Sequence, residues 1–269
     1  MHWTYITYLP AVVSALWPLA IFARKKHPTR AQLLLSAAML MVAFALVMGT
    51  VILRGRTYSL FIYQYLLQLV AILAGPVYYI AICALTEPRG SSLRQRHSLV
   101  LPLLFILALS LLVLLLGPRR YEHLCLLFRY RMLFPLEGDT LWNLTSILSY
   151  PVFTALLLAT DLPLLFMASR KCRVYQSRFN SYYAEGINAP KHNSRPIHII
   201  AWLFLPLALA AVLIIALRPA FQKYLLVAIA LLLSVLQFLL GRYTYSLDFD
   251  ARYLAQIVKM KNEKMKNEE

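Results

Sequence analysis

Apolar residues run almost continuously along this chain and are interrupted at intervals by short polar segments. Seven of the runs approach or exceed the roughly 20 residues that an α-helix needs to cross a hydrocarbon core of about 30 Å. They are continuous, unlike the alternating segments of about 10 residues in membrane barrels. We therefore predict seven transmembrane helices, over Trp3–Phe22, Ala31–Leu53, Tyr58–Leu85, Leu99–Leu116, Leu141–Ala168, Ile197–Leu217 and Phe221–Leu240.

The composition agrees with this pattern. Of the 269 residues, 61% are hydrophobic and 14% are charged, whereas soluble domains contain about 25% charged residues. The predicted fold is an all-α membrane protein with a seven-helix transmembrane domain over residues 1–241. A cytoplasmic C-terminal amphipathic helix or tail is expected over residues 242–269.

The distribution of Lys and Arg predicts the orientation of these helices. Of the 27 basic residues, 19 fall in segments 23–30, 86–98, 169–196 and 241–269, which a seven-span topology places on one side. Because cytoplasmic segments are enriched in Lys and Arg, we predict that the N-terminus is outside and the C-terminus inside. The net charge of +16 then reflects topology and contact with anionic lipid headgroups, and no nucleic-acid binding is expected.

Asp161 is the only acidic residue that lies well inside a predicted span. A carboxylate at that depth costs a few kcal/mol on insertion scales, so it has to be protonated, paired or hydrated. Arg24 or Arg242, near inner helix ends, is a candidate partner. The residue forms either a structural ion pair or polar contact, or a proton relay or conformational switch.

Neutral polar side chains gather toward the outer half of two spans. Gln64 and Gln68 share one face of the third span because they are four residues apart, and Asn143 and Ser146 begin the fifth. These four residues are candidates for an outward-facing ligand pocket. Hydrogen bonding between helices explains such residues equally well.

Two loops are longer than the others. The outer loop, Gly117–Thr140, mixes aromatic, leucine and arginine residues, which is typical of an amphipathic segment lying on the headgroups; the alternative is a lid over an outer cavity. The inner loop, Ser169–Pro196, is basic, and is either an ordinary cytoplasmic loop or a docking surface for a cytoplasmic partner.

No catalytic pattern is present: the sequence has no HExxH, GxSxG or P-loop motif. The three cysteines, Cys83, Cys125 and Cys172, lie far apart without CxxC spacing, which argues against a disulfide framework or a zinc site. Since no Lys lies deep in the seventh span, a retinal Schiff base is not expected. We predict a protein that is not an enzyme and has no cofactor or metal.

The stretch from Leu66 to Phe105 carries a Gly-Pro-x-Tyr-Tyr element, a basic segment, and then a His followed by Leu-Pro. These residues are Gly75, Pro76, Tyr78, Tyr79, His97, Leu101 and Pro102. The stretch resembles the membrane region of bacterial membrane-bound AraC-type helix-turn-helix regulators. The resemblance implies a sensory module in a bacterial inner membrane. Only 29 residues follow Leu240, too few for the DNA-binding domain of that family, so DNA binding is not expected.

The C-terminal segment Asp248–Glu269 has helical periodicity, with apolar residues at positions 249, 253 and 257. Tyr253 and Ile257 are therefore candidate coupling residues in a helix that continues the seventh span and contacts a partner or a second copy. The alternative is a helix lying on the membrane surface.

Three functions remain open from the sequence. The first is a heptahelical sensor or receptor-like module that passes a signal through its C-terminal helix to a cytoplasmic signalling protein, or within a homodimer. The second is a small transporter or permease with Asp161 in a proton or substrate path. The third is a membrane scaffold subunit without a ligand.

Overall fold

A computed structural model describes residues 3–24, 28–54, 60–87, 97–131, 138–184 and 222–246. Within these ranges the regular structure is entirely helical, and no strand occurs, so the predicted all-α class is confirmed. The predicted sixth span, Ile197–Leu217, and the segment Asp248–Glu269 with Tyr253 and Ile257 lie outside the described residues.

The helices follow the apolar runs, except that the last helix of the fifth predicted span continues to Ala184, so the first part of the predicted inner loop Ser169–Pro196 is helical. They are α1 (Trp3–Ile6), α2 (Leu9–Arg24), α3 (Arg30–Arg54), α4 (Leu60–Thr86), α6 (Val100–Leu116), α7 (Pro118–Arg131), α8 (Thr140–Ile147), the π-helical segment η1 (Leu148–Val152), α9 (Phe153–Ala184) and α11 (Gln222–Ser246). A capping box fixes the start of α3: the Gln32 N–H donates to Thr29 Oγ1, and the Thr29 N–H donates to Gln32 Oε1.

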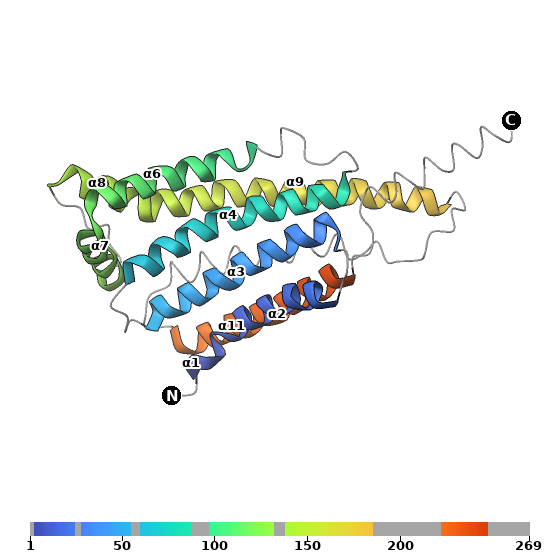
Figure 1. Cartoon of the computed structure of the whole chain (residues 1–269), viewed down its shortest axis with the longest axis horizontal. Helices are drawn as coiled ribbons and strands as arrows, with labels where there is room; N and C mark the ends of the chain where they lie inside the picture. Colours follow the sequence, from blue (N-terminus) through green and yellow to red (C-terminus); the bar gives the residue numbers. More distant parts are fainter. Residues whose placement is uncertain are drawn as a thin grey trace.

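Figure 1 shows the long helices lying side by side with their axes roughly aligned. Helix α3 lies between α4 and α2, α11 packs on α2, and α9 packs on the other side of α4. Helices α2, α4, α9 and α11 run in one direction, and α3 and α6 run in the opposite direction. We call the end where α7 lies the α7 end, and the opposite end, where α4 finishes, the Glu87 end.

Three helical stretches are long and apolar enough to cross a membrane: Arg30–Ile52, Phe61–Thr86 and Thr140–Ser177. The bent pair α6–α7 counts as a fourth if it is one broken span, and α2 is apolar but shorter. On α6, leucines are exposed along the helix, and Leu114 is 78% exposed. Such a surface is costly in water and suits contact with lipid, consistent with an integral membrane protein.

Candidate functional site

A sharp bend between α6 and α7 places α7 across one end of the bundle (Figure 1). The two helices meet at 107°. Gly117 makes the bend with a φ of +84°, a conformation that favours glycine. Pro118 then begins α7, where its missing N–H costs no helical hydrogen bond. The Gly-Pro pair therefore ends one helix and starts the next in a new direction.

Helix α7 packs its apolar side against the bundle. Tyr121 and Leu124 are fully buried and Cys125 is nearly so, in a cluster with Leu116 and Trp142. The predicted outer loop therefore contains a helix that covers the α7 end of the bundle. The two predicted alternatives, an interfacial segment and a lid over an outer cavity, both remain predictions for this helix.

Gln68 on α4 connects this covering helix to the fifth predicted span. Its side chain is completely buried. The Tyr121 hydroxyl donates to Gln68 Oε1 at 3.3 Å, and Gln68 Nε2 donates to the backbone carbonyl of Ser149. One amide therefore links three elements, α7, α4 and η1, in a place where an unpaired polar group costs about 1–3 kcal/mol.

The Ser149 carbonyl belongs to a π-helical turn, Leu148–Val152, that contains Pro151. At the end of this turn the Phe153 N–H bonds to the carbonyls of Leu148 and Tyr150. The carbonyl between them, that of Ser149, accepts from Gln68. Short π-helical turns within α-helices occur frequently at functional sites, and this one allows a side chain from another helix to enter the backbone hydrogen-bonding pattern.

The four candidate ligand residues have different environments. Gln68 and Ser146 are buried, whereas Gln64 and Asn143 are half-buried. Ser146 Oγ has no hydrogen-bond partner within the described part of the chain. The prediction missed Tyr121, which contacts Gln68 directly; the only available signal was its position near the start of the predicted lid.

Asp161 lies in α9, facing the Gly-Pro element of α4. The residue is 5% exposed, and its Oδ1 atom has no hydrogen-bond partner among the described residues. A Cβ atom at Gly75 would lie 2.7 Å from Asp161 Cγ and would overlap Oδ1. The absence of a side chain at position 75 is therefore what makes room for this carboxylate in the bundle.

The predicted ion pair of Asp161 with Arg24 or Arg242 is not formed. Both arginines are exposed, near the ends of α2 and α11. Those two helices pack on each other and on α3, while α9 packs on α4 and η1. Helices α3 and α4 therefore separate the carboxylate from the proposed cations, a layering that the sequence does not reveal.

Helix α11, which precedes the predicted coupling segment, is held by polar contacts in its second half. Ser14 Oγ lies 2.9 Å from both Gln237 Oε1 and the Met39 carbonyl. Gln32 Nε2 donates to the Thr244 carbonyl at 3.2 Å. Since Gln32 also caps α3, the end of α11 is tied to the start of that helix.

The arrangement offers hydrogen-bonding groups and one buried carboxylate. No group of three metal-ligating side chains occurs among the described residues. Neither the protein-family models, nor the curated proteins, nor the solved structures contain a match to this chain.

Proposed function

We propose that this protein is a heptahelical membrane sensor without enzymatic activity, in which α7 responds to a stimulus and the α4–α9 interface carries the response. The proposed orientation places the α7 end outside and the Glu87 end in the cytoplasm. The proposal includes a bacterial inner membrane, as the resemblance to the membrane-bound regulators implies.

The observation that carries the proposal is the path from Tyr121 through Gln68 to Asp161. Gln68 and Gly75 are seven residues apart, two helical turns or about 10 Å, so they face the same side of α4. Gln68 bonds to η1, and Gly75 lies against Asp161 in the helix that follows η1. A movement of α7 would therefore act on the Gln68–Ser149 hydrogen bond and on the close approach of Gly75 to Asp161.

The proposed two-state element is the π-helical turn at Leu148–Val152. A sensor needs two arrangements of similar free energy, between which a ligand or force selects. If one residue of this turn changed from π-helical to α-helical hydrogen bonding, α9 would rotate relative to η1. The rotation would move Asp161 relative to Gly75. Tyr253 and Ile257 would then pass the change to a cytoplasmic partner or a second copy of the chain.

The seven-helix topology is part of the proposal. The Lys and Arg distribution supports it, and so do the directions of the helices. Helices α9 and α11 run the same way (Figure 1), so a seven-span chain requires one further crossing between them. The apolar run Ile197–Leu217 supplies the sequence for that crossing.

The sensor is tested by releasing α7 and observing the opposite end. In a background with Cys83 and Cys125 replaced by alanine, Cys172 is the remaining thiol and is fully buried. In the full chain reconstituted in nanodiscs, we expect Tyr121→Phe to change the rate at which a maleimide labels Cys172. A membrane scaffold predicts an unchanged rate. Gln64→Leu, on α4 but half-buried, is the matched control.

A transporter is the second candidate, because Asp161 has a buried, unpartnered carboxylate oxygen. It predicts that proteoliposomes containing the chain collapse an imposed pH gradient, and that Asp161→Asn stops this flux. The sensor predicts no flux above that of empty liposomes. A pH-sensitive dye inside the vesicles distinguishes the two.

A further inference from the structure

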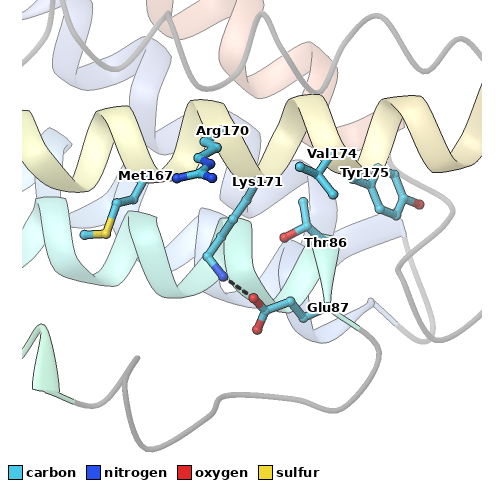
Figure 2. Close-up of a pocket in the computed structure, with 7 residues that line it drawn as sticks. All are labelled: Thr86, Glu87, Met167, Arg170, Lys171, Val174 and Tyr175. Atoms are coloured by element: carbon cyan, nitrogen blue, oxygen red, sulfur yellow. Dashed lines mark hydrogen bonds and ion pairs between the residues drawn. The ribbon is translucent and has the colours of Figure 1, made fainter.

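A cavity of about 380 Å³ opens at the Glu87 end, between the last turn of α4 and the middle of α9. Figure 2 shows Arg170 and Lys171 projecting from α9 beside it, with Glu87 facing Lys171 from the end of α4. Met167 and Val174 line it from the turns on either side. The cavity therefore combines charged groups with apolar walls.

The charges in the cavity leave one positive charge in excess. Lys171 Nζ forms an ion pair with a Glu87 carboxylate oxygen, so these two charges offset each other. Arg170 is exposed, and no ion pair is recorded for its guanidinium within the described ranges. A guanidinium presents a planar set of donors that matches the oxygens of a carboxylate or phosphate. The cavity thus suits a group with a single negative charge.

An exposed apolar row on α9 leads to these charges. Leu162, Phe166 and Met167 are 36%, 70% and 45% exposed, and their spacing places them along one side of the helix. Arg170 follows one turn after Met167. A ligand with a long apolar chain could lie along this row while its charged group reached Arg170.

The cavity also lies at the depth expected of a lipid headgroup. The apolar stretch of α4 that is long enough to span a membrane ends at Thr86, and Thr86 is itself in the cavity wall. Basic pockets between transmembrane helices on the cytoplasmic side bind anionic headgroups. A water-soluble anion has no apolar chain to bury against this row. An acidic peptide carries several negative charges, more than the one excess positive charge of the cavity would offset.

We propose that this cavity binds an anionic phospholipid, with the phosphodiester against the Arg170 guanidinium and one acyl chain along Leu162, Phe166 and Met167. The inference rests on the proposed function for the orientation of the Glu87 end, but not on signalling, because the cavity and the membrane-spanning helices α4 and α9 are otherwise all that it uses. Lys171 would interact with both the phosphate and Glu87. The Glu87 carboxylate, being negative, would oppose phosphate binding.

The test is a lipid titration of the purified full chain in nonionic detergent, with bound lipid counted by native mass spectrometry. We expect phosphatidylglycerol to bind more tightly than phosphatidylcholine, and Arg170→Gln to weaken phosphatidylglycerol binding about thirtyfold, the loss of charge-assisted hydrogen bonds. The matched control is Arg173→Gln, an exposed arginine on α9 outside the cavity wall. It should weaken binding no more than about fivefold, the effect of one surface charge.

One further variant and one competition experiment also test the proposal. Glu87→Gln should strengthen phosphatidylglycerol binding about fivefold, since the competing carboxylate is removed; unchanged or weaker binding would overturn it. Glycerol 3-phosphate at the same concentration should not displace the lipid. Displacement would show that the cavity takes a free phosphate instead, and equal losses in the Arg170→Gln and Arg173→Gln variants would show attraction to the surface alone.

Discussion

In each of two helix pairs of this molecule, the helices approach closely at a glycine, but the side chain that faces the glycine differs between the pairs. In α4–α9, Gly75 faces the carboxylate of Asp161; in α2–α11, Gly241 faces the indole of Trp17. The indole also contacts Phe238 edge-on, with ring centroids 5.4 Å apart. The α2–α11 contact is therefore aromatic packing, whereas the α4–α9 contact places a polar group in the bundle.

This difference shows where function is to be sought. An indole gains free energy from burial and needs the glycine only for a close fit. A carboxylate oxygen without a partner loses free energy on burial, so packing alone gives no reason for Asp161 beside Gly75. Local choices that oppose stability concentrate at functional sites, and this comparison singles out the α4–α9 contact.

The largest effect is expected from Gly75→Ala. The new methyl group would overlap the Asp161 carboxylate, which is buried, so we expect a loss of about 3 kcal/mol in the free energy of unfolding. Unfolding is measured by denaturant titration in mixed micelles. The control is Gly49→Ala in α3, where no atom lies within 4 Å of the added Cβ; it should be neutral or stabilising by up to about 1 kcal/mol.

A double variant tests the assignment of this loss to Asp161. In Gly75→Ala combined with Asp161→Ala, the carboxylate that meets the methyl group is gone, so most of the stability should return. If the double variant is no more stable than Gly75→Ala alone, the glycine is required for another reason and the comparison with Gly241 fails.

Gln68→Leu should have the next largest effect. It removes the partner of the Ser149 carbonyl and of the Tyr121 hydroxyl, so we expect a loss of about 2 kcal/mol in the free energy of unfolding. The control is Gln64→Leu, one turn earlier on α4 and half-buried, which should cost less than about 0.5 kcal/mol. Equal losses in the two variants would mean that Gln68 does not bridge α7 and η1.

Gly241→Ala tests the other side of the comparison. Its methyl group would overlap Trp17 Cγ and Cδ1, but Trp17 is half-buried and its neighbour Phe238 is 47% exposed, so the ring can move outward. We expect a loss of about 1 kcal/mol, accompanied by a shift in tryptophan fluorescence. A loss as large as that of Gly75→Ala would show that the indole is held as firmly as the carboxylate.

The sequence predicted the long helices well and the contacts between them poorly. The run Ala31–Leu53 became α3, Arg30–Arg54, because continuous apolar residues without a breaker specify a spanning helix by length alone. Gly117–Pro118 specified a break, but not the 107° angle or the burial of Tyr121. The π-helical turn at Leu148–Val152 contains Pro151, but no sequence pattern specified π-helical pairing there.

Contacts such as Asp161 with Gly75 could not be predicted, because they depend on how each helix is rotated about its axis. The two residues are 86 positions apart, in helices that are apolar on nearly every side. Without a strong difference between faces, the pattern does not say which face meets a neighbour. The same argument explains why Arg24 and Arg242 were plausible partners for Asp161 until the layers of helices were known.

The smallest effect concerns Asp139, a partly exposed carboxylate that contrasts with the buried Asp161. It forms an ion pair with Arg120 and caps α8 by accepting from the Leu141 N–H. The Arg120 guanidinium and then the Leu141 N–H hold the pKa of this carboxyl below its ordinary value. A carboxyl with a lowered pKa in the folded state stabilises the protein above its unfolded pKa of about 3.9, and that stabilisation is lost as the pH falls through the lowered value.

We therefore expect Asp139→Asn, which keeps a capping side chain but removes the charge, to reduce thermal stability slightly at pH 7, and we expect the difference from the parent to shrink as the pH falls below the unfolded pKa of about 3.9. Because both partners are partly exposed to solvent, 48% for Arg120 and 35% for Asp139, the difference should also shrink as salt is added. Thermal unfolding in nonionic detergent measures both trends. The control is Glu122→Gln on α7, the helix that carries Arg120; Glu122 forms no ion pair within the described part of the chain. If the Asp139→Asn difference persisted at low pH, the effect would come from the cap and not from the charge. Asp139 would then not serve as the charge-paired carboxylate with which Asp161 is compared.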